Sequence, residues 1–397
     1  MLSLHNIRSI ALYETKTLFR SWFFRIFAIV ALLVMLGFNM VCIRFWSYKS
    51  SPAMIPWCNL VFLNVVQAII AVFLASDFLK RDKKLDTTEV IYIRPMTNAE
   101  YVIGKLLGNL VVFFVLNLLI LGMGLIFNSI AQHTYIEWAA YLYYFLLMSL
   151  PTLIYIFGLS FFVMSLIRNQ AVTFIILLGY IAITLFYLKS NLYYLFDYMS
   201  FHVPMFYSDI TGFGELNKLL VHRGLYLMLG MSLVCFTIAM LQRLPNASGS
   251  PKKAAVCGLL FFVAAAWLGY RHVSASLDDY RLRAQMQTLN DSYADVKTVD
   301  VTDYNLDVTH SGSTLTITAV LDVENTDDIP LPKLVFSLNP GLTLTGVMDG
   351  EKPLDFERKL NIIELAVELQ PAETRRLTFT YAGTINEAAC FLDATDE

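Results

Sequence analysis

The sequence predicts a membrane all-α bundle of about six to seven transmembrane helices, followed by a small extracytoplasmic antiparallel β-sandwich-like domain. Three observations lead to this prediction. Long apolar runs fill the chain up to residue 270, and only 15% of all residues are charged, against about 25% in soluble proteins. Lys and Arg gather in alternate loops between these runs. Beyond Arg271 the composition turns acidic and rich in Thr, Asp and Val, which marks a domain boundary.

The apolar runs give the crossings, because one span needs about 20 apolar residues. We expect crossings near residues 23–43, 57–76, 106–127, 138–166, 171–188, 224–241 and 254–270, which together form a transmembrane domain over residues 23–270. The fourth run is too long for one straight helix. Pro151 lies inside it, so we expect either a kink at this proline or a part that lies along the interface.

The charges of the short loops give the orientation, since cytoplasmic loops carry the excess of Lys and Arg. One set of loops holds Arg8, Lys16, Arg20, Lys80, Arg81, Lys83, Lys84, Arg94, Lys105, Arg168, Arg243, Lys252 and Lys253. The opposite set holds only Arg44, Lys49, Lys189, Lys218 and Arg223. We therefore expect a cytoplasmic N-terminus and, after seven spans, an extracytoplasmic C-terminal domain.

Three segments outside the spans have their own patterns. Residues 1–22 place Leu4, Ile7, Ala11, Leu18 and Trp22 on one helical face, which predicts an amphipathic helix on the cytoplasmic interface; a plain soluble helix is the alternative. Residues 191–213 are crowded with aromatic side chains and contain Pro204, so we expect short interfacial or re-entrant helices. Residues 271–297 are polar and predict a linker helix.

Residues 298–397 have the pattern of short β-strands. Leu315, Ile317, Ala319, Leu321 and Val323 alternate with mostly polar residues over 313–325, which predicts a half-buried strand. Further strands are expected near 299–309, 333–338, 342–347, 361–369 and 375–381, with turns at Asn339-Pro340-Gly341 and Asp349-Gly350. Such a series of short strands is typical of an antiparallel sandwich.

The sequence contains no recognisable catalytic or metal site. It has no G-x-x-x-x-G-K-[ST], no H-E-x-x-H and no C-x-x-C, so we expect no enzyme activity, metal or cofactor in this chain. Among the five cysteines, Cys42 and Cys58 fall near the outer ends of adjacent spans. They are either small buried hydrophobic residues or a disulfide.

Ionisable residues are essentially absent from the predicted spans, since Arg25, Asp77 and Glu137 lie at ends. Their absence argues against an ion-driven transporter, which usually needs buried carboxylates or His, and a dry, uncharged interior favours a lipid, peptide or other amphipathic cargo. The polar residues within spans are neutral: Asn64, Gln67, Asn117 and Thr173. Asn64, Gln67 and Asn117 either line a pathway or join helices by hydrogen bonds.

A basic loop at residues 80–105 is the most distinctive segment of the chain. Thr87 or Thr88 can cap a short helix, Glu89 suits its first turn, and Pro95 ends it. Val90, Ile91 and Ile93 could be buried against a soluble partner. The alternative is an ordinary basic loop that serves only to orient the spans.

The run from Thr87 to Lys105 resembles the loop between the second and third spans of ABC-2 type transporter permeases. In that family a threonine–glutamate pair precedes an apolar stretch, a proline, a small polar residue and a glycine–lysine pair that opens the next span. The run Ala11-Leu12-Tyr13-Glu14-Thr15-Lys16 with Arg20 is similar to that family's N-terminal helix, and the aromatic outer segment is similar too. The resemblance covers about residues 4–243.

This resemblance implies a multi-pass permease subunit of an exporter in the bacterial inner membrane. It implies a separate ATP-binding subunit that carries ATP-Mg, a second permease copy in a homodimer, contact with the lipid bilayer and no nucleic acid. The loop would be a coupling helix in a groove of the ATPase. The residues that it assigns to this contact are Thr87, Thr88, Glu89, Val90, Ile91, Ile93, Arg94 and Pro95.

The C-terminal domain has a resemblance of its own. The runs Tyr304-Asn305-Leu306-Asp307-Val308, Leu315-Thr316-Ile317-Thr318-Ala319 and Leu377-Thr378-Phe379-Thr380-Tyr381-Ala382-Gly383 resemble the N-terminal β domain of aminopeptidase N-like zinc metallopeptidases. Two alternatives to the permease therefore remain. One is a membrane anchor or scaffold for the β domain. The other is the N-terminal part of a membrane-anchored zinc aminopeptidase fused to a permease domain, whose chain would continue past Glu397 to an H-E-x-x-H.

Overall fold

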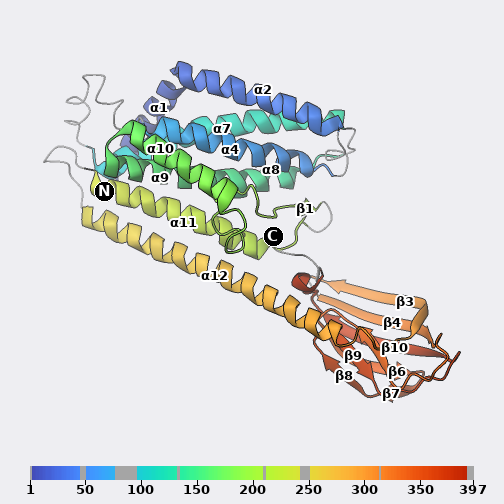
Figure 1. The fold of residues 1–397 in the computed structure, drawn as a ribbon. Helices are drawn as coiled ribbons and strands as arrows, with labels where there is room; N and C mark the ends of the chain where they lie inside the picture. The colour runs from blue at the N-terminus through green and yellow to red at the C-terminus, as the bar shows by residue number, and fades with distance from the viewer. Residues whose placement is uncertain are drawn as a thin grey trace. The chain divides into compact units, whose positions relative to one another are not determined.

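The computed structural model describes residues 2–44, 51–76, 96–131, 135–208, 212–241, 251–312 and 314–390. The chain divides into two compact units, Met1–Ser274 and Ala275–Glu397. The first is helical and the second contains the larger β-sheets (Figure 1). The predicted order of a helical membrane bundle and a small antiparallel β region is confirmed.

Seven helical segments of the described chain are long and apolar enough to cross a bilayer, as the apolar runs predict. The first three are α2 (Trp22–Arg44), α4 (Met54–Ser76) and α7 (Asn98–Ile130). The fourth consists of α8 (Trp138–Tyr144), η1 (Phe145–Ser149) and α9 (Leu150–Ile167), and the fifth consists of α10 (Gln170–Ala182) and η2 (Ile183–Tyr187). The last two are α11 (Leu216–Met240) and α12 (Pro251–Asp291). A separate helix, α1 (Leu4–Arg20), precedes them.

The fourth segment is interrupted just where the sequence places a proline. The π-helical turn η1 runs from Phe145 to Ser149, and Pro151 follows in the first turn of α9. Proline has no backbone N–H, and a π-turn shifts the hydrogen-bond register by one residue. Carbonyl groups in this turn therefore need donors from outside the helix.

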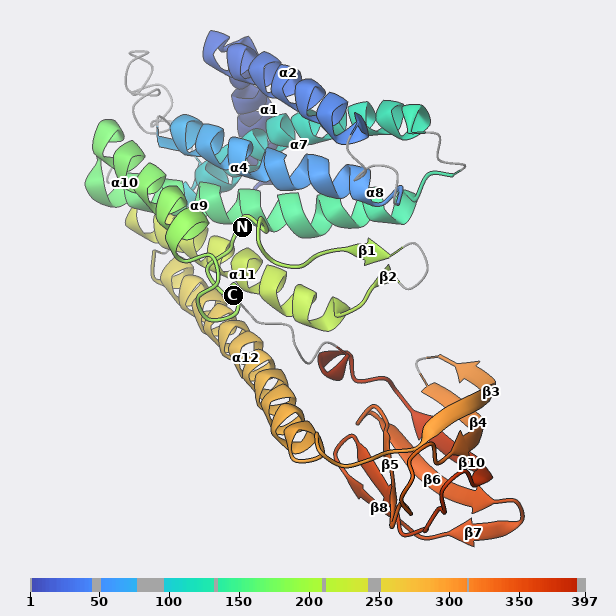
Figure 2. The same cartoon turned by 45° about the vertical axis from the view of Figure 1, so that its right-hand side comes forward.

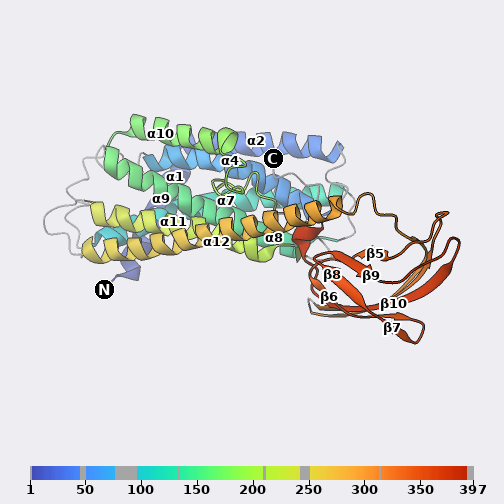
Figure 3. The same ribbon diagram turned by 60° about the horizontal axis from the view of Figure 1, so that its bottom comes forward.

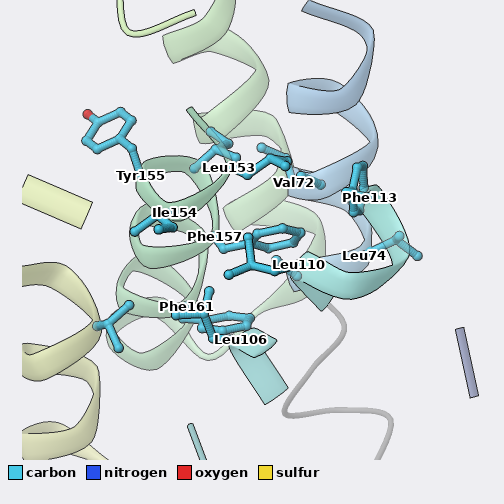
Figure 4. Close-up of a cluster of buried hydrophobic side chains, with 14 of the residues drawn as sticks. Val72, Leu74, Leu106, Leu110, Phe113, Leu153, Ile154, Tyr155, Phe157 and Phe161 are labelled. Carbon is cyan, nitrogen blue, oxygen red and sulfur yellow. The ribbon is translucent and has the colours of Figure 1, made fainter. Parts of the chain in front are cut away.

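Glycine allows two of these helices to approach closely. A Cβ atom added to Gly158 on α9 would lie 2.6 Å from the carbonyl oxygen of Gly230 on α11. Further along the core, Phe113 on α7 meets Phe157 on α9 edge-on at 5.4 Å between ring centroids. Figure 4 shows this cluster, in which side chains of α4, α7 and α9 such as Val72 and Leu110 pack together.

The seventh crossing continues into the segment predicted to be a separate linker helix. Helix α12 runs without interruption from Pro251 to Asp291, and no Gly or Pro occurs between residues 270 and 291 to end it. Within the first unit α11 and α12 lie side by side (Figures 1 and 3), and Ser232 Oγ donates to the carbonyl of Gly258 at 2.8 Å.

The prediction of short helices within residues 191–213 is wrong. The described residues of this segment form turns and a minimal hairpin of β1 (Tyr207–Ser208) and β2 (Gly212–Phe213). Leu192, Tyr193 and Tyr194 all have positive φ angles, of 51°, 58° and 63°. Three successive residues in the left-handed region are incompatible with a right-handed helix, so aromatic content alone misled the prediction.

The second unit contains two antiparallel sheets, of five and three strands (Figure 2). The larger sheet has the order β3-β4-β10-β6-β7 and the smaller β5-β9-β8. Their bounds are β3 (Asp300–Ser311), β4 (Thr314–Glu324), β10 (Thr374–Gly383), β6 (Leu342–Asp349), β7 (Lys352–Leu354), β5 (Leu334–Ser337), β9 (Ile362–Leu365) and β8 (Phe356–Lys359), followed by η3 (Glu387–Ala389).

Side chains of both sheets share one hydrophobic core, which includes Leu334, Leu365 and Leu377. All six predicted strands are present, and Gly350 makes one predicted turn with a φ of 59°. Strands β7 and β8 were not predicted, because three or four residues are too few to display an alternating pattern.

Candidate functional site

The predicted coupling residues lie outside the part of the chain that the structure describes. These are Thr87, Thr88, Glu89, Val90, Ile91, Ile93, Arg94 and Pro95. The described chain stops at Ser76, the end of α4, and resumes at Met96, just before α7. The candidate site is therefore built from the described residues that receive this loop.

The first turn of α7 is joined to α1 by one carboxylate. Thr97 caps α7 and forms a capping box with Glu100, whose Oε2 accepts from the Thr97 N–H at 3.0 Å. The same side chain accepts from the Ser3 N–H at 2.7 Å and from Asn6 Nδ2 at 3.1 Å. Because Glu100 serves both helices, the last part of the predicted coupling loop, which forms the first turn of α7, is fixed to the start of α1.

One turn further on, α1 and α7 touch backbone to backbone. A Cβ on Gly104 would lie 3.1 Å from the Ile7 carbonyl oxygen, and one on Gly108 would lie 2.8 Å from that of Ala11. Two glycines four residues apart lie on the same face of a helix. Small residues in this pattern let helices approach closely in membranes. Thr15 Oγ1 uses this proximity to donate to the carbonyl of Gly108 at 3.2 Å.

A buried ion pair lies beside this crossing. Lys105 Nζ is 3.5 Å from Glu14 Oε2, and the two side chains are 3% and 2% exposed. Removing either partner would leave a charge in the interior, which typically costs about 3–5 kcal/mol. The pair therefore fixes the register of α1 on α7 as well as the distance between them.

A second polar cluster joins the helices deeper in the bundle. Asn117 Nδ2 donates to Gln67 Oε1 at 2.8 Å, and Gln67 Nε2 donates to Asn64 Oδ1 at 2.5 Å. Ser149 Oγ donates to Asn117 Oδ1 at 2.7 Å. All four side chains are fully buried. In this conformation the three predicted polar residues are engaged with protein groups on α4, α7 and η1.

Arg223 is fully buried within α11, although the sequence placed it in an outer loop. Its guanidinium donates to the carbonyls of Leu147 at 2.7 Å and Met148 at 3.1 Å. Both carbonyls belong to the π-turn before Pro151, which has no N–H to donate to Leu147. An arginine on one span thus supplies Leu147 with the hydrogen bond that a proline on another span cannot give, and donates a second one to Met148.

The same arginine holds the segment between η2 and α11. Its Nη1 donates to the Tyr198 carbonyl at 3.0 Å, and Thr152 Oγ1 donates to the same oxygen at 2.8 Å. Asn64 Nδ2 binds the next carbonyl, of Met199, at 3.0 Å. Non-helical backbone inside a membrane domain must find such partners within the protein.

The comparisons with known proteins bear on this helical unit first. The profile of the family described as ABC-2 family transporter protein matches residues 21–219, from the end of α1 into α11. The chain belongs to the ABC-2 transporter family. It is a multi-pass membrane protein with the family's permease domain, as the resemblance at residues 87–105 predicts.

The comparison with solved structures matches a β region to M1 zinc metallopeptidases. One is the M1 zinc metallopeptidase from Deinococcus radiodurans, with 26% identity and a TM-score of 0.20. Another is a two-domain M1 zinc metallopeptidase mutant bound to L-arginine, with 27% identity and a TM-score of 0.20. Each match covers 22% of this chain and 21% of that chain. No curated protein matches.

In this ABC-2 permease domain, sequence reasoning missed the buried ionisable groups. It took the spans to be essentially free of them, yet Arg223, His222, His272 and Lys105 are buried in the helices. His222 Nε2 is hydrogen-bonded to the Tyr194 carbonyl at 3.1 Å. The expectation of an uncharged interior is therefore wrong, while the cargo class inferred from it stays a prediction.

Two signals in the sequence could have revealed the close packing around Lys105 and the burial of Arg223. Gly104 and Gly108 form a G-x-x-x-G in an apolar run, the usual sign of close helix packing. The predicted sixth span began one residue after Arg223, and a start at Leu216 would have included it. Cys42 and Cys58 form no disulfide in this structure.

Proposed function

We propose that this chain is the membrane-spanning permease subunit of an ABC-type exporter, driven by a separate ATP-binding subunit. The observation that carries the proposal is membership of the ABC-2 transporter family. The sequence itself contains no G-x-x-x-x-G-K-[ST], so ATP-Mg would be hydrolysed on the partner.

The contacts of α7 supply a route for the mechanical coupling. Residues 80–95 of the predicted loop precede Thr97, which caps α7, and Glu100 ties that point to α1. A displacement of the loop would therefore move α1 and α7 together, with the Glu14–Lys105 pair resisting sliding. Because interfaces of packed helices shift as units, closure of the ATPase would rock this pair against α4, α9 and α11.

The arrangement of the helix ends supports the proposed orientation. The start of α2, the end of α4 and the start of α7 lie at the same end of the bundle as α1 (Figure 1). The basic residues counted from the sequence gather at these ends, so we assign them to the cytoplasm of a bacterial cell and the β unit to the outside. A thiol introduced at Thr326 should react with a membrane-impermeant reagent in intact cells, and one at Lys83 should not; equal labelling would contradict this topology.

The proposed assembly contains two copies of this chain and two ATPase subunits. In a twofold assembly the spans of one permease subunit line one side of the transport pathway, and the second copy lines the other side. We expect a dimer of this chain by native mass spectrometry when the ATPase is bound. A single copy with one ATPase would contradict this stoichiometry.

The coupling loop is tested by replacing its apolar residues. Val90→Asp with Ile91→Asp should bury unpaired charge at the ATPase contact and weaken association by several kcal/mol, about 3–5 for a buried unpaired charge. Membrane levels should stay normal, because the loop lies outside the spans, while ATPase co-purification and coupled ATP turnover are lost. The matched control is Lys83→Gln with Lys84→Gln, which changes loop charge but not its apolar face. If the ATPase still binds the Asp variant, the loop only orients the spans.

A further inference from the structure

Strand β3 is an unusually open edge of the β unit. It pairs with β4 over residues 300–311, and among the described strands it has no neighbour on its other side (Figure 2). All of its 12 residues are exposed. Long edge strands of this kind expose unpaired backbone N–H and C=O groups, which natural proteins usually shorten, cover or twist away.

One face of β3 is apolar and continues the core side of the sheet. Tyr304, Leu306 and Val308 pair with Leu321, Ala319 and Ile317 on β4, and these three partners are buried in the core. The β3 residues themselves remain 55%, 43% and 50% exposed. The core side of the sheet therefore extends beyond the described residues that cover it.

The opposite face of β3 is acidic. Asp303 and Asp307 alternate with the apolar residues, and Asp300 lies at the start of the strand. No Lys or Arg occurs between residues 300 and 311. On β4 the neighbouring Asp322 already holds Arg376 in a bidentate pair, with both distances 2.6 Å. The edge thus presents one apolar row and one row of negative charge.

We propose that β3 binds an extended segment of a partner protein, which adds to the sheet as a sixth strand and carries apolar and basic residues in alternation. The backbone of the segment would bond to the free edge. Its apolar side chains would lie beside Tyr304, Leu306 and Val308, and its Lys or Arg side chains beside Asp303 and Asp307, because cross-strand neighbours are about 4.5–5.5 Å apart.

The charges on β3 select this occupant over a second copy of the chain. Two β3 strands paired across a twofold axis would bring two acidic rows together, and like charges at neighbouring cross-strand positions are destabilising. A basic segment gains from the same aspartates. Specificity therefore arises from the acidic row, and affinity from the backbone and the apolar row.

The test uses the full chain in nanodiscs of zwitterionic lipid and two fluorescent peptides, one alternating Val and Lys, the other Val and Glu. We expect fluorescence anisotropy to show saturable binding of the Val–Lys peptide, at least tenfold tighter than of the Val–Glu peptide and weakened by salt. Asp303→Lys with Asp307→Lys should reverse this preference. The matched control is Glu351→Lys with Asp355→Lys, which makes the same change in net charge at exposed positions away from β3 and should leave the preference intact.

Backbone pairing is read separately by hydrogen exchange. The Val–Lys peptide should slow amide exchange in β3 and leave β7, the opposite edge of the sheet, unchanged. Leu306→Lys, which places a charge in the apolar row, should weaken binding at least tenfold while circular dichroism stays the same. The proposal is overturned if both peptides bind equally, if the control variants act like the β3 variants, or if β3 amides are already protected by a second copy before peptide is added.

Discussion

Replacing Gly108 by alanine should weaken the docking of α1 on α7. The added Cβ would lie 2.6 Å from Glu14 Cβ and 2.8 Å from the Ala11 carbonyl oxygen, whereas carbon atoms in contact prefer about 3.5–4.0 Å. Rotation of a side chain cannot relieve the contact with Ala11, because that atom is backbone. The helix α1 must therefore move outward by about 1 Å, the difference between these distances.

This movement has a calculable cost. Overpacking of this kind costs about 1–3 kcal/mol, and the lower part of this range applies because α1 can move outward as a whole. The Thr15–Gly108 hydrogen bond, already 3.2 Å long, and the Glu14–Lys105 pair at 3.5 Å would both lengthen. A net loss of about 1–2 kcal/mol lowers the ratio of docked to undocked α1 by a factor of about 5–30.

Hydrogen exchange measured by mass spectrometry reads this ratio directly, because undocked α1 loses its protection. We expect amides of α1 to exchange about 5–30 times faster in Gly108→Ala, with the amides of α11 unchanged. Gly122→Ala is the matched control: it lies on the same helix, and nothing lies within 4 Å of its added Cβ. Equal protection of α1 in the two variants would refute the close packing of α1 on α7.

Three further outcomes are expected. Arg223→Met should lower the unfolding temperature, because each carbonyl left unpaired costs about 1–3 kcal/mol. In a Pro151→Ala background the decrease should be smaller, since residue 151 can then donate to Leu147. An equal decrease in both backgrounds would refute the compensation of Pro151 by Arg223. Asn117→Leu should lower the unfolding temperature, because Gln67 Oε1 loses its donor and Ser149 Oγ loses its shorter hydrogen bond. An unchanged temperature would argue against the polar cluster as a helix junction. The hydrogen bond from Tyr293, together with one from Lys333, holds the pKa of Glu364 below its usual value. The stability that Glu364 adds over Glu364→Gln should therefore be present above about pH 4.3, and it should be lost as the pH falls from there through the lowered pKa. A pH-independent difference in unfolding temperature between the two proteins would contradict this.

Much of this fold could be predicted from local sequence. The apolar runs gave all seven spans because hydrocarbon leaves the backbone no partner except its own helix. The alternation over Ser313–Asn325 gave β4 because one face of a strand is buried and the other is not. The candidate coupling residues were also chosen from sequence, and for them the prediction stays a prediction.

The polar contacts were decided only by the tertiary structure. Nothing near Arg223 in the sequence indicates that its donors will meet the carbonyls of Leu147 and Met148, on another span. Likewise Glu14 looks like an ordinary residue of a surface helix until α1 is packed on α7 and Lys105 comes within 3.5 Å. Whether a charged group is exposed or buried depends on its partner, and that partner is distant in the chain.

The difference between what the sequence determined and what only the tertiary structure decided has one physical reason. The partition of apolar side chains between water and hydrocarbon, or between the two faces of a strand, is a property of each segment alone, so the sequence by itself determined the spans and most of the strands. A buried hydrogen bond needs a donor and an acceptor at the right distance at the same time. Only the tertiary structure decided that Pro151 would be compensated by Arg223, and that Gly104 and Gly108 would bring α1 close enough for Glu14 to reach Lys105.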